Sequence, residues 1–206
     1  MPKVLRADAF LLLLLLALAG CKPPRMGHIR PVSVESIAPG YITFNNGETV
    51  RMPFAGRQNT TFIFLVRHAE KGYGSDPTLT FQGVKRAQLL AHIFKELPLD
   101  AVFATEYKRT QETAQPAARE KGLEVELYEG DELTTFALRL RRKYRGQSVL
   151  VVGHSNTTPD LVNRLVADGV LERIDERDYS NFYIVAINEE GEKEVLQLKF
   201  GEVWVE

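Results

Sequence analysis

The chain has 206 residues, of which 26% are charged and 44% are hydrophobic, and its formal net charge at pH 7 is -1. This length and composition are ordinary for one folded globular domain, so general disorder is excluded as a description of the chain. The nearly neutral charge also argues against a protein that holds nucleic acid through a basic excess. Any binding of an anion must therefore depend on a local cluster of cationic side chains.

The first twenty residues predict an export signal. Lys3 and Arg6 precede an apolar run at 9–19, which suits a signal peptide and is shorter than the roughly 20 residues of a membrane-spanning helix. The run ends in "LAGC", which resembles a bacterial lipobox and implies cleavage before Cys21 and acylation of its thiol. Lys22 at the next position implies an outer-membrane anchor facing the periplasm. The alternative is an unmodified thiol, and because Cys21 is the single cysteine it can form no intramolecular disulfide.

Residues 21–39 then predict a lipidated cysteine and a tether, because "KPPRMGHIRP" is rich in proline and basic residues. The folded domain is expected at 40–206. It opens with two short alternating runs around Asn46-Gly47, a dipeptide typical of tight turns, so we expect a hairpin at 41–52.

From Thr61 onward the sequence alternates between strand and helix patterns. Short apolar or alternating runs predict strands at 61–66, 99–105, 123–128, 148–153, 181–187 and 193–200. Apolar residues at steps of three and four predict helices at 80–97, 106–122, 132–146 and roughly 158–168. Thr80 is the expected cap of the first helix, and the last two strands are expected to pair antiparallel. Strands and helices in this order predict an α/β fold, a three-layer sandwich with a largely parallel central sheet.

Cationic and imidazole side chains follow three of the predicted strands. Arg67 and His68 follow the first, Arg109 lies shortly after "AVFAT", and His154 follows "VLVVG". Ligands of open α/β sheets bind at the carboxyl ends of the strands, where the positive ends of helices also point. We therefore expect these side chains to converge on one dianionic phosphoryl group.

These residue types suit phosphoryl transfer through the protein. A neutral imidazole is a competent nucleophile near pH 7 and can take a phosphoryl group as phosphohistidine. Guanidinium groups stay charged and stabilise the charge on the phosphoryl oxygens, and a protonated His154 would add another donor. Water would then release phosphate and the free His68.

The motifs "RHAE", "DPTLTFQGVKRAQLLA", "ATEYKRTQETAQPAA" and "VVGHSNT" together resemble the histidine phosphatase superfamily, in its phosphoglycerate-mutase-like branch. The resemblance runs from about Thr61 to Thr158 and implies a phosphoglycerate-mutase-like fold. It implies that His68 accepts the phosphoryl group and that Arg67 and Arg109 clamp it. It further implies that His154 is the second catalytic histidine. Thr80 and Asn156 are implied to bind substrate, and Glu70 to orient the first loop.

Two departures from the family pattern concern the substrate. Ala69 stands where glycine is commonest, a variant associated with small bacterial phosphohistidine phosphatases, and Lys71 is either a phosphate contact or, as we favour, a solvated side chain. Members that cleave alkyl esters carry an acidic residue after the second arginine. Here "YEGDEL" offers Glu129, which we favour, with Asp131 and Glu132 as alternatives; all three being exposed or helix-capping acids is equally compatible with the sequence.

The remaining polar residues suggest no second site. His28 and His92 are expected to face solvent, and the histidine spacing argues against a structural zinc site. The basic run at 139–145 suits a solvated helix end, with anionic lipid headgroups as the less favoured partner.

We therefore predict a phosphatase, independent of metal and cofactor, that hydrolyses phosphomonoesters at the cell envelope. Its expected partners are a phosphorylated small molecule or envelope component and, through the lipid, a membrane, but no nucleic acid. The alternatives are a protein phosphohistidine phosphatase and a non-catalytic phosphate-binding lipoprotein. The natural substrate and the oligomeric state are left open by the sequence.

Overall fold

The computed structural model describes residues 32–167 and 170–203. The expected signal peptide, the lipidation site at Cys21 and most of the tether lie outside the described residues. The described chain forms a six-stranded sheet in the order β6-β5-β7-β4-β8-β9 and a three-stranded sheet in the order β1-β2-β3.

The six-stranded sheet is parallel over four neighbouring strands and antiparallel at one edge. The parallel strands are β6 (Val125–Leu127), β5 (Ala101–Ala104), β7 (Ser148–Gly153) and β4 (Thr61–Arg67). The antiparallel edge is formed by β8 (Asn181–Ile187) and β9 (Lys193–Lys199), which were expected to pair. The largely parallel sheet predicted from the sequence is confirmed.

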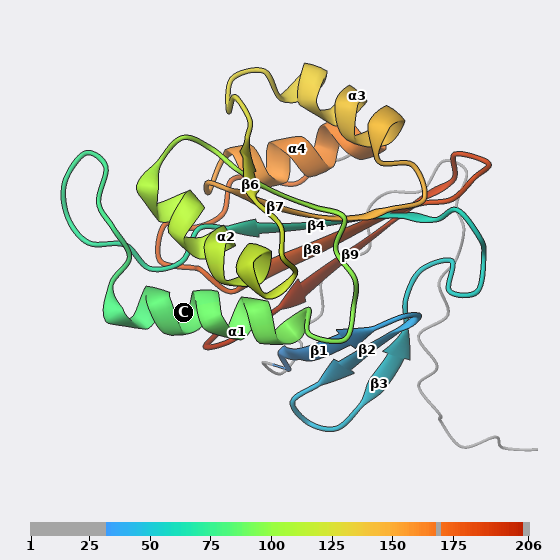
Figure 1. Ribbon diagram of the computed structural model, residues 1–206, viewed down its shortest axis with the longest axis horizontal. Helices are drawn as coiled ribbons and strands as arrows, with labels where there is room; N and C mark the ends of the chain where they lie inside the picture. The colour runs from blue at the N-terminus through green and yellow to red at the C-terminus, as the bar shows by residue number, and fades with distance from the viewer. Residues whose placement is uncertain (1–31, 168–169, 204–206) are drawn as a thin grey trace, which may run out of the picture. The chain divides into compact units, whose positions relative to one another are not determined.

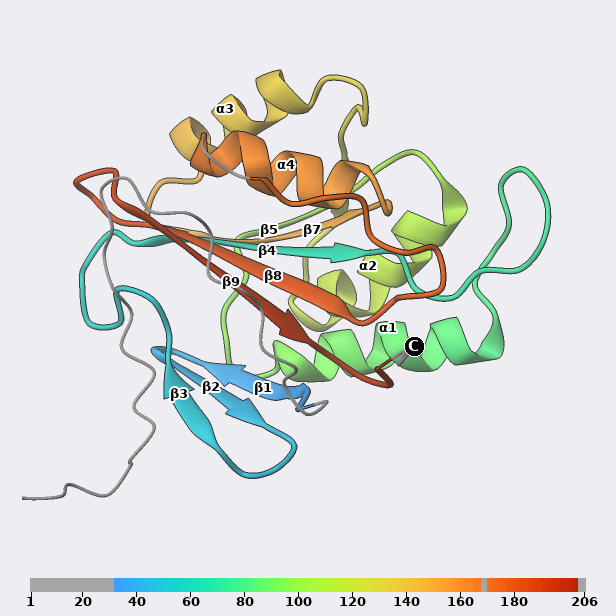
Figure 2. The same ribbon diagram turned by 180° about the vertical axis from the view of Figure 1, so that it is seen from behind.

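Helices cover both faces of this sheet, as Figures 1 and 2 show. On one face lie α1 (Phe81–Ile93) and α2 (Lys108–Glu120), and on the other lie α3 (Leu133–Lys143) and α4 (Thr157–Val166). Successive residues of a strand point to opposite faces. Phe64 and Val66 of β4 therefore join the core beneath α1 and α2, whereas Ile63 and Leu65 join the core beneath α3 and α4. Each helix buries its apolar side against one sheet face, which produces the three layers.

The smaller sheet contains the expected hairpin and one strand that the sequence pattern did not reveal. In the hairpin, β2 (Tyr41–Phe44) pairs antiparallel with β3 (Thr49–Arg51), and Gly47 takes a left-handed backbone conformation with φ +83° in the turn. The additional strand β1 (Val34–Ala38) pairs with β2. Ile37 and Ile42 of this sheet are fully buried in the same core as α1.

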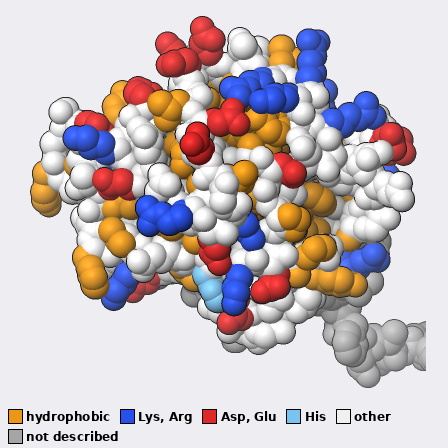
Figure 3. Space-filling view, in the orientation of Figure 1, with side chains coloured by type: hydrophobic (Ala, Val, Ile, Leu, Met, Phe, Trp, Pro, Cys, Tyr) orange, Lys and Arg blue, Asp and Glu red, His pale blue; other side chains and the backbone are white. Residues whose placement is uncertain are grey.

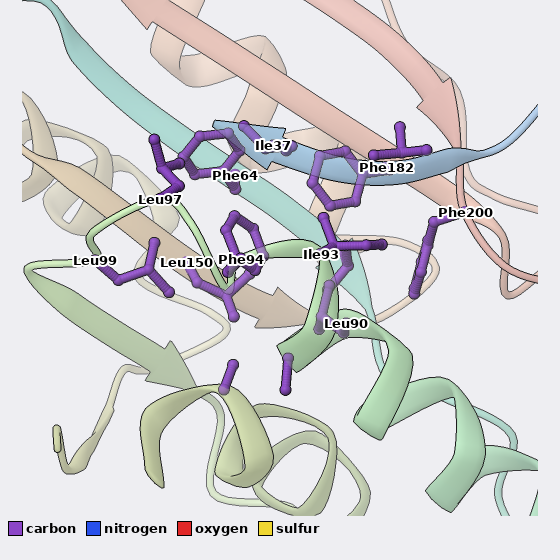
Figure 4. Close-up of a cluster of buried hydrophobic side chains, with 14 of the residues drawn as sticks. Ile37, Phe64, Leu90, Ile93, Phe94, Leu97, Leu99, Leu150, Phe182 and Phe200 are labelled. Carbon is purple, nitrogen blue, oxygen red and sulfur yellow. The ribbon is translucent and has the colours of Figure 1, made fainter. Parts of the chain in front are cut away.

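Aromatic side chains fill the centre of that core (Figure 4). Phe64 of β4 meets Phe94, just beyond α1, edge to face with ring centroids 5.0 Å apart, and Phe182 of β8 lies 6.0 Å from Phe94. Such pairs add roughly 0.5–1.5 kcal/mol beyond the area they bury. Strands and helices far apart in the sequence thereby share one hydrophobic core.

Charged side chains of both signs are interspersed on the described part of the face in Figure 3. This mixture agrees with the nearly neutral net charge of the chain. Within residues 32–167 and 170–203, no helix combines the length and the apolar character that crossing a membrane would require.

Candidate active site

The two histidines meet because their strands are neighbours in register. Arg67, the last residue of β4, is the register partner of Gly153, the last residue of β7, and the backbone N–H of His68 donates to the Gly153 carbonyl at 2.9 Å. The next residues of the two strands, His68 and His154, therefore leave the sheet edge side by side. Their ring centroids are 5.6 Å apart. The predicted convergence of the strand ends is seen for this pair.

A cleft of about 530 Å³ opens at this edge of the sheet. The predicted site residues that line it are His68, Arg109, Glu129, Asp131, His154 and Asn156. Lys71 also lines the cleft and is half-buried. Its side chain can therefore contact a ligand there, whereas the sequence favours a solvated lysine.

His68 is held as a neutral imidazole with one particular nitrogen free. Its side chain is 3% exposed, and Nδ1 lies 2.8 Å from the carbonyl oxygen of Ala69, which can only accept, so Nδ1 carries the proton. The pKa of His68 is lowered to about 3, mainly by burial. The hydrogen bond to Ala69 opposes this shift, and the charges of Arg67 and Arg109 add to it. The lone pair is therefore on Nε2 over the whole neutral range of pH, which is the form that a nucleophile requires.

Arg67 is almost completely buried beside the nucleophile. Its Nη1 donates to the carbonyl oxygens of Asp175 and Asp178, at 2.9 and 3.2 Å, and its Nη2 donates to the Glu176 carboxylate at 2.6 Å. The guanidinium also stacks on Tyr179, 4.2 Å from the ring centroid. Burial lowers the pKa of Arg67, and these partners oppose that effect. The segment that follows α4 thus fixes the orientation of the guanidinium.

Arg109 approaches the same place from the first turn of α2. Its Nη2 lies 3.4 Å from Nδ1 of His154, and its guanidinium carbon lies 4.3 Å from the centroid of the Tyr107 ring. Thr113, one turn further along α2, accepts a hydrogen bond from the Ala69 backbone N–H at 2.9 Å and donates to the Arg109 carbonyl at 2.7 Å. The loop after β4, which carries His68, is thereby joined to the first turn of α2, which carries Arg109.

Each of the two arginines has one buried donor without an acceptor. Within residues 32–167 and 170–203, the buried side-chain nitrogen and oxygen atoms that lack a hydrogen-bond partner are Nε of Arg67 and Nε of Arg109. A buried polar group without a partner costs roughly 1–3 kcal/mol, so such groups in a folded protein call for a physical reason. An anion bound in the cleft would supply an acceptor to Nε of Arg109, which lines the cleft, whereas Arg67 is not among the lining residues.

Two motif residues support the loop from outside the cleft. Thr80 caps α1, accepting a hydrogen bond from the Gly83 N–H at 3.1 Å, and its own N–H donates to the Glu70 carbonyl at 2.9 Å. The structure therefore places Thr80 as a helix cap and not among the cleft-lining residues. Both carboxylate oxygens of Glu70 accept from Arg86 at 2.8–3.0 Å. Glu70 thus anchors the loop after His68, and it is paired with Arg86, not with Arg67.

The acidic candidates are separated by the structure, although none is singled out as the proton donor. Glu129 and Asp131 are exposed at the cleft, whereas Glu132 occupies the cap position of α3 and does not line the cleft. Glu106 lines it too and was not recognised from the sequence. Glu176 accepts from Ser155 at 2.7 Å and from Arg173; despite partial burial, these partners lower its pKa to about 2.

Several residues of the site were not recognised in the sequence. Arg173 and Glu176 belong to a segment without motif or periodicity, so no pattern could identify them. Thr105 could have been found, because it directly follows an apolar strand just as His68 and His154 do. Among the described residues, no group of three or more histidine, cysteine, aspartate or glutamate side chains is arranged to hold a metal ion.

Comparison with known proteins links part of the chain to one family. Residues 63–134 match the family model of the histidine phosphatase superfamily (branch 1). The matched range contains His68 and Arg109 and ends before His154, which the structure itself places beside His68. About a third of the chain thus resembles the histidine phosphatase superfamily, and this part holds the first predicted catalytic histidine.

Solved structures show the same fold at low sequence identity. The protein histidine phosphatase SixA complexed with tungstate is 19% identical, with a TM-score of 0.56 over 67% of this chain and 96% of that one. The alpha-ribazole phosphatase from Shigella flexneri is 18% identical, with a TM-score of 0.56 over 70% and 99%. A phosphoglycerate mutase from Plasmodium falciparum is 18% identical, with a TM-score of 0.50 over 70% and 92%. The fold is thus phosphoglycerate-mutase-like, as predicted, whereas none of the curated proteins compared with the sequence matches it.

Proposed function

We propose that this chain hydrolyses phosphomonoesters through a phosphohistidine formed on Nε2 of His68. The observation that carries the proposal is the pair of buried, unpartnered Nε–H groups of Arg67 and Arg109 beside a neutral imidazole. A phosphoryl group in the cleft would give the Arg109 donor an acceptor and would present phosphorus to the free lone pair of His68, and we propose that the buried Arg67 contacts the same group.

The reaction then has two steps. Nε2 of His68 attacks phosphorus, the bond from phosphorus to the leaving oxygen breaks, and the leaving oxygen keeps the electron pair and takes a proton. Water next attacks the phosphorus of the phosphohistidine, the phosphorus–nitrogen bond breaks, and its electron pair returns to Nε2 while the water loses a proton. In both steps the guanidinium groups of Arg67 and Arg109 stabilise the charge on the equatorial oxygens.

The class of leaving group depends on the proton donor. We propose Glu129, because it is the favoured residue of the acidic stretch and its side chain lines the cleft. An alkoxide leaving group needs such a donor, which typically raises the rate by about 100 to 10,000-fold. The leaving groups of phosphohistidine and of aryl phosphates depart without one. A strict protein phosphohistidine phosphatase is therefore the second candidate, and it is supported by Ala69 and by the fold shared with SixA.

Phosphate release separates these possibilities. The protein is incubated in EDTA with an aryl phosphate, an alkyl phosphate and phosphoramidate. We expect release from all three, loss of all release in His68→Ala, and a fall of about 100 to 1,000-fold in kcat/KM for Arg109→Met, since one such donor is worth about 3–4 kcal/mol. His92→Ala, on the exposed side of α1, is the matched control and should be fully active. Release from phosphoramidate alone would favour the phosphohistidine phosphatase, and no release at any pH would favour a phosphate-binding lipoprotein.

We also propose that the enzyme works at the cell envelope, anchored by a lipid on Cys21, on a phosphorylated small molecule or envelope component. Support comes from the sequence, in which "LAGC" ends a signal-like apolar run and Lys22 follows it. Two or more acyl chains would give stable membrane attachment, each buried methylene contributing about 0.8 kcal/mol. We expect Cys21→Ala to lose acyl labelling and to leave the outer-membrane fraction of a Gram-negative cell. Unchanged membrane attachment of this variant would contradict the proposal.

A further inference from the structure

Both ring nitrogens of His154 have a polar partner. Nε2 lies 2.9 Å from the hydroxyl oxygen of Thr105, and Nδ1 lies 3.4 Å from Nη2 of Arg109. Thr105, at the end of β5, is 1% exposed, and the hydroxyl of Thr110 next to it is fully buried.

The directions of these hydrogen bonds follow from counting protons. The Thr110 hydroxyl donates to the backbone carbonyl oxygens of Tyr107 and Thr105, at 2.7 and 3.0 Å, so its single proton is committed. Thr110 can then only accept from the Thr105 hydroxyl, 2.9 Å away. Because the Thr105 proton is committed in turn, Thr105 must accept from His154, and the proton of the neutral imidazole is on Nε2.

The other side of the ring requires the same assignment. A guanidinium has donors and no acceptor, so Nη2 of Arg109 can only donate to Nδ1 of His154. Nδ1 therefore carries the lone pair. Burial and the charges of Arg109 and Arg67 lower the pKa of His154 to about 4. The ring is therefore neutral near pH 7 and carries a single N–H.

We propose that Thr105 is a positioning residue that keeps the proton of His154 on Nε2 and thereby keeps the lone pair on Nδ1, which takes a proton during phosphoryl transfer in exchange for its hydrogen bond from Arg109. This inference rests on the proposed phosphatase function. When water attacks the phosphohistidine, the new phosphorus–oxygen bond forms, the phosphorus–nitrogen bond breaks, and the proton lost by the water passes to Nδ1 of His154. That proton then leaves to solvent, which restores the neutral ring. With the opposite tautomer, the Nδ1–H would face the Arg109 donor and no base would be available there.

The chain offers variants that separate the hydroxyl of Thr105 from its shape. Thr105→Val keeps the branched side chain and removes the hydroxyl, so we expect kcat to fall at least about 10-fold with KM changed less than about 3-fold. Thr105→Ser keeps the hydroxyl and should retain kcat within about 3-fold of the unmodified protein. Thr110→Val leaves the Thr105 proton without its acceptor, so that Thr105 can donate to Nε2; kcat should fall here as well. Thermal melts establish that each variant is folded.

The deciding measurement is nitrogen-15 NMR of the His154 ring, assigned by comparison with His154→Gln. We expect a protonated Nε2 and a bare Nδ1 in the unmodified protein, and the reverse or a mixture in Thr110→Val. A proton on Nδ1 in the unmodified protein would overturn the inference, as would a fully active Thr105→Val or a Thr105→Ser variant as impaired as Thr105→Val. The NMR assignment needs no turnover, so a protein without phosphatase activity would refute the proposed function and leave the tautomer measurable.

Discussion

Burial of His68 should make the free energy of unfolding of the domain decrease as the pH is lowered, and a substitution of His68 should remove this contribution. In the folded protein burial lowers the pKa of His68 to about 3, whereas an unfolded chain binds this proton near the ordinary pKa of 6.5. Below pH 6.5 the unfolded state therefore holds more protons than the folded state, and the free energy of unfolding decreases as the pH falls towards 3. His68→Asn has no proton to bind and lacks this contribution.

The magnitude follows from these two pKa values. Between pH 7 and pH 5, His68 alone should reduce the free energy of unfolding by about 2 kcal/mol, since each tenfold change in proton concentration is worth about 1.4 kcal/mol once the unfolded imidazole titrates. His154 acts in the same direction because its pKa is also lowered, but it is present in both proteins. The variant should therefore lose about 2 kcal/mol less than the unmodified protein over this interval.

Urea denaturation at pH 7 and at pH 5 measures these differences directly. The quantity to compare is the change in the free energy of unfolding between the two pH values, because any effect of His68→Asn that is independent of pH cancels. His92→Asn, which changes an exposed histidine of α1, should behave as the unmodified protein does. If His68→Asn and the unmodified protein lost stability equally, within about 0.5 kcal/mol, the neutral buried imidazole would be refuted.

Three further predictions concern the loop and the clamp. Gly83→Ala should destabilise the domain by about 2 kcal/mol, since its Cβ would lie 2.1 Å from the Glu70 carbonyl oxygen; Gln88→Ala, exposed on the same helix, should be neutral in thermal melts, and equal melting temperatures would contradict the close contact. Arg86→Met leaves the Glu70 carboxylate unpaired and should cost about 3 kcal/mol in urea denaturation, part of which Arg86→Met with Glu70→Gln regains; no recovery would argue against this ion pair as the cause. Orthovanadate at 100 times its Kd should stabilise the protein by about 2.7 kcal/mol, and Arg109→Met should abolish this shift at the same concentration.

Much of the fold could be predicted because its determinants are local. Apolar runs, helical periodicity and glycine stops are read from neighbouring residues, and they located the strands and helices of the six-stranded sheet. The short strand β1 was not predicted because its residues show no clear alternation. It is stabilised by pairing with β2 and by burial of Val34 and Ile37. Such stabilisation depends on contacts that no sequence window contains.

The features of the site also divide into those that local sequence predicts and those that depend on the fold. The sequence by itself predicted that two histidines and one arginine would stand at the ends of parallel strands and a second arginine near the start of the following helix, because strand ends can be recognised from neighbouring residues. Only the tertiary structure decided that Glu176 engages Arg67, that Thr105 bonds His154, and that Thr80, the helix cap predicted from the sequence, does not line the cleft. The two hydrogen-bonded pairs are 109 and 49 residues apart in the sequence, so only the path of the backbone brings their members within hydrogen-bonding distance. The direction of each hydrogen bond, and with it the free nitrogen on each histidine, is therefore a property of the folded chain.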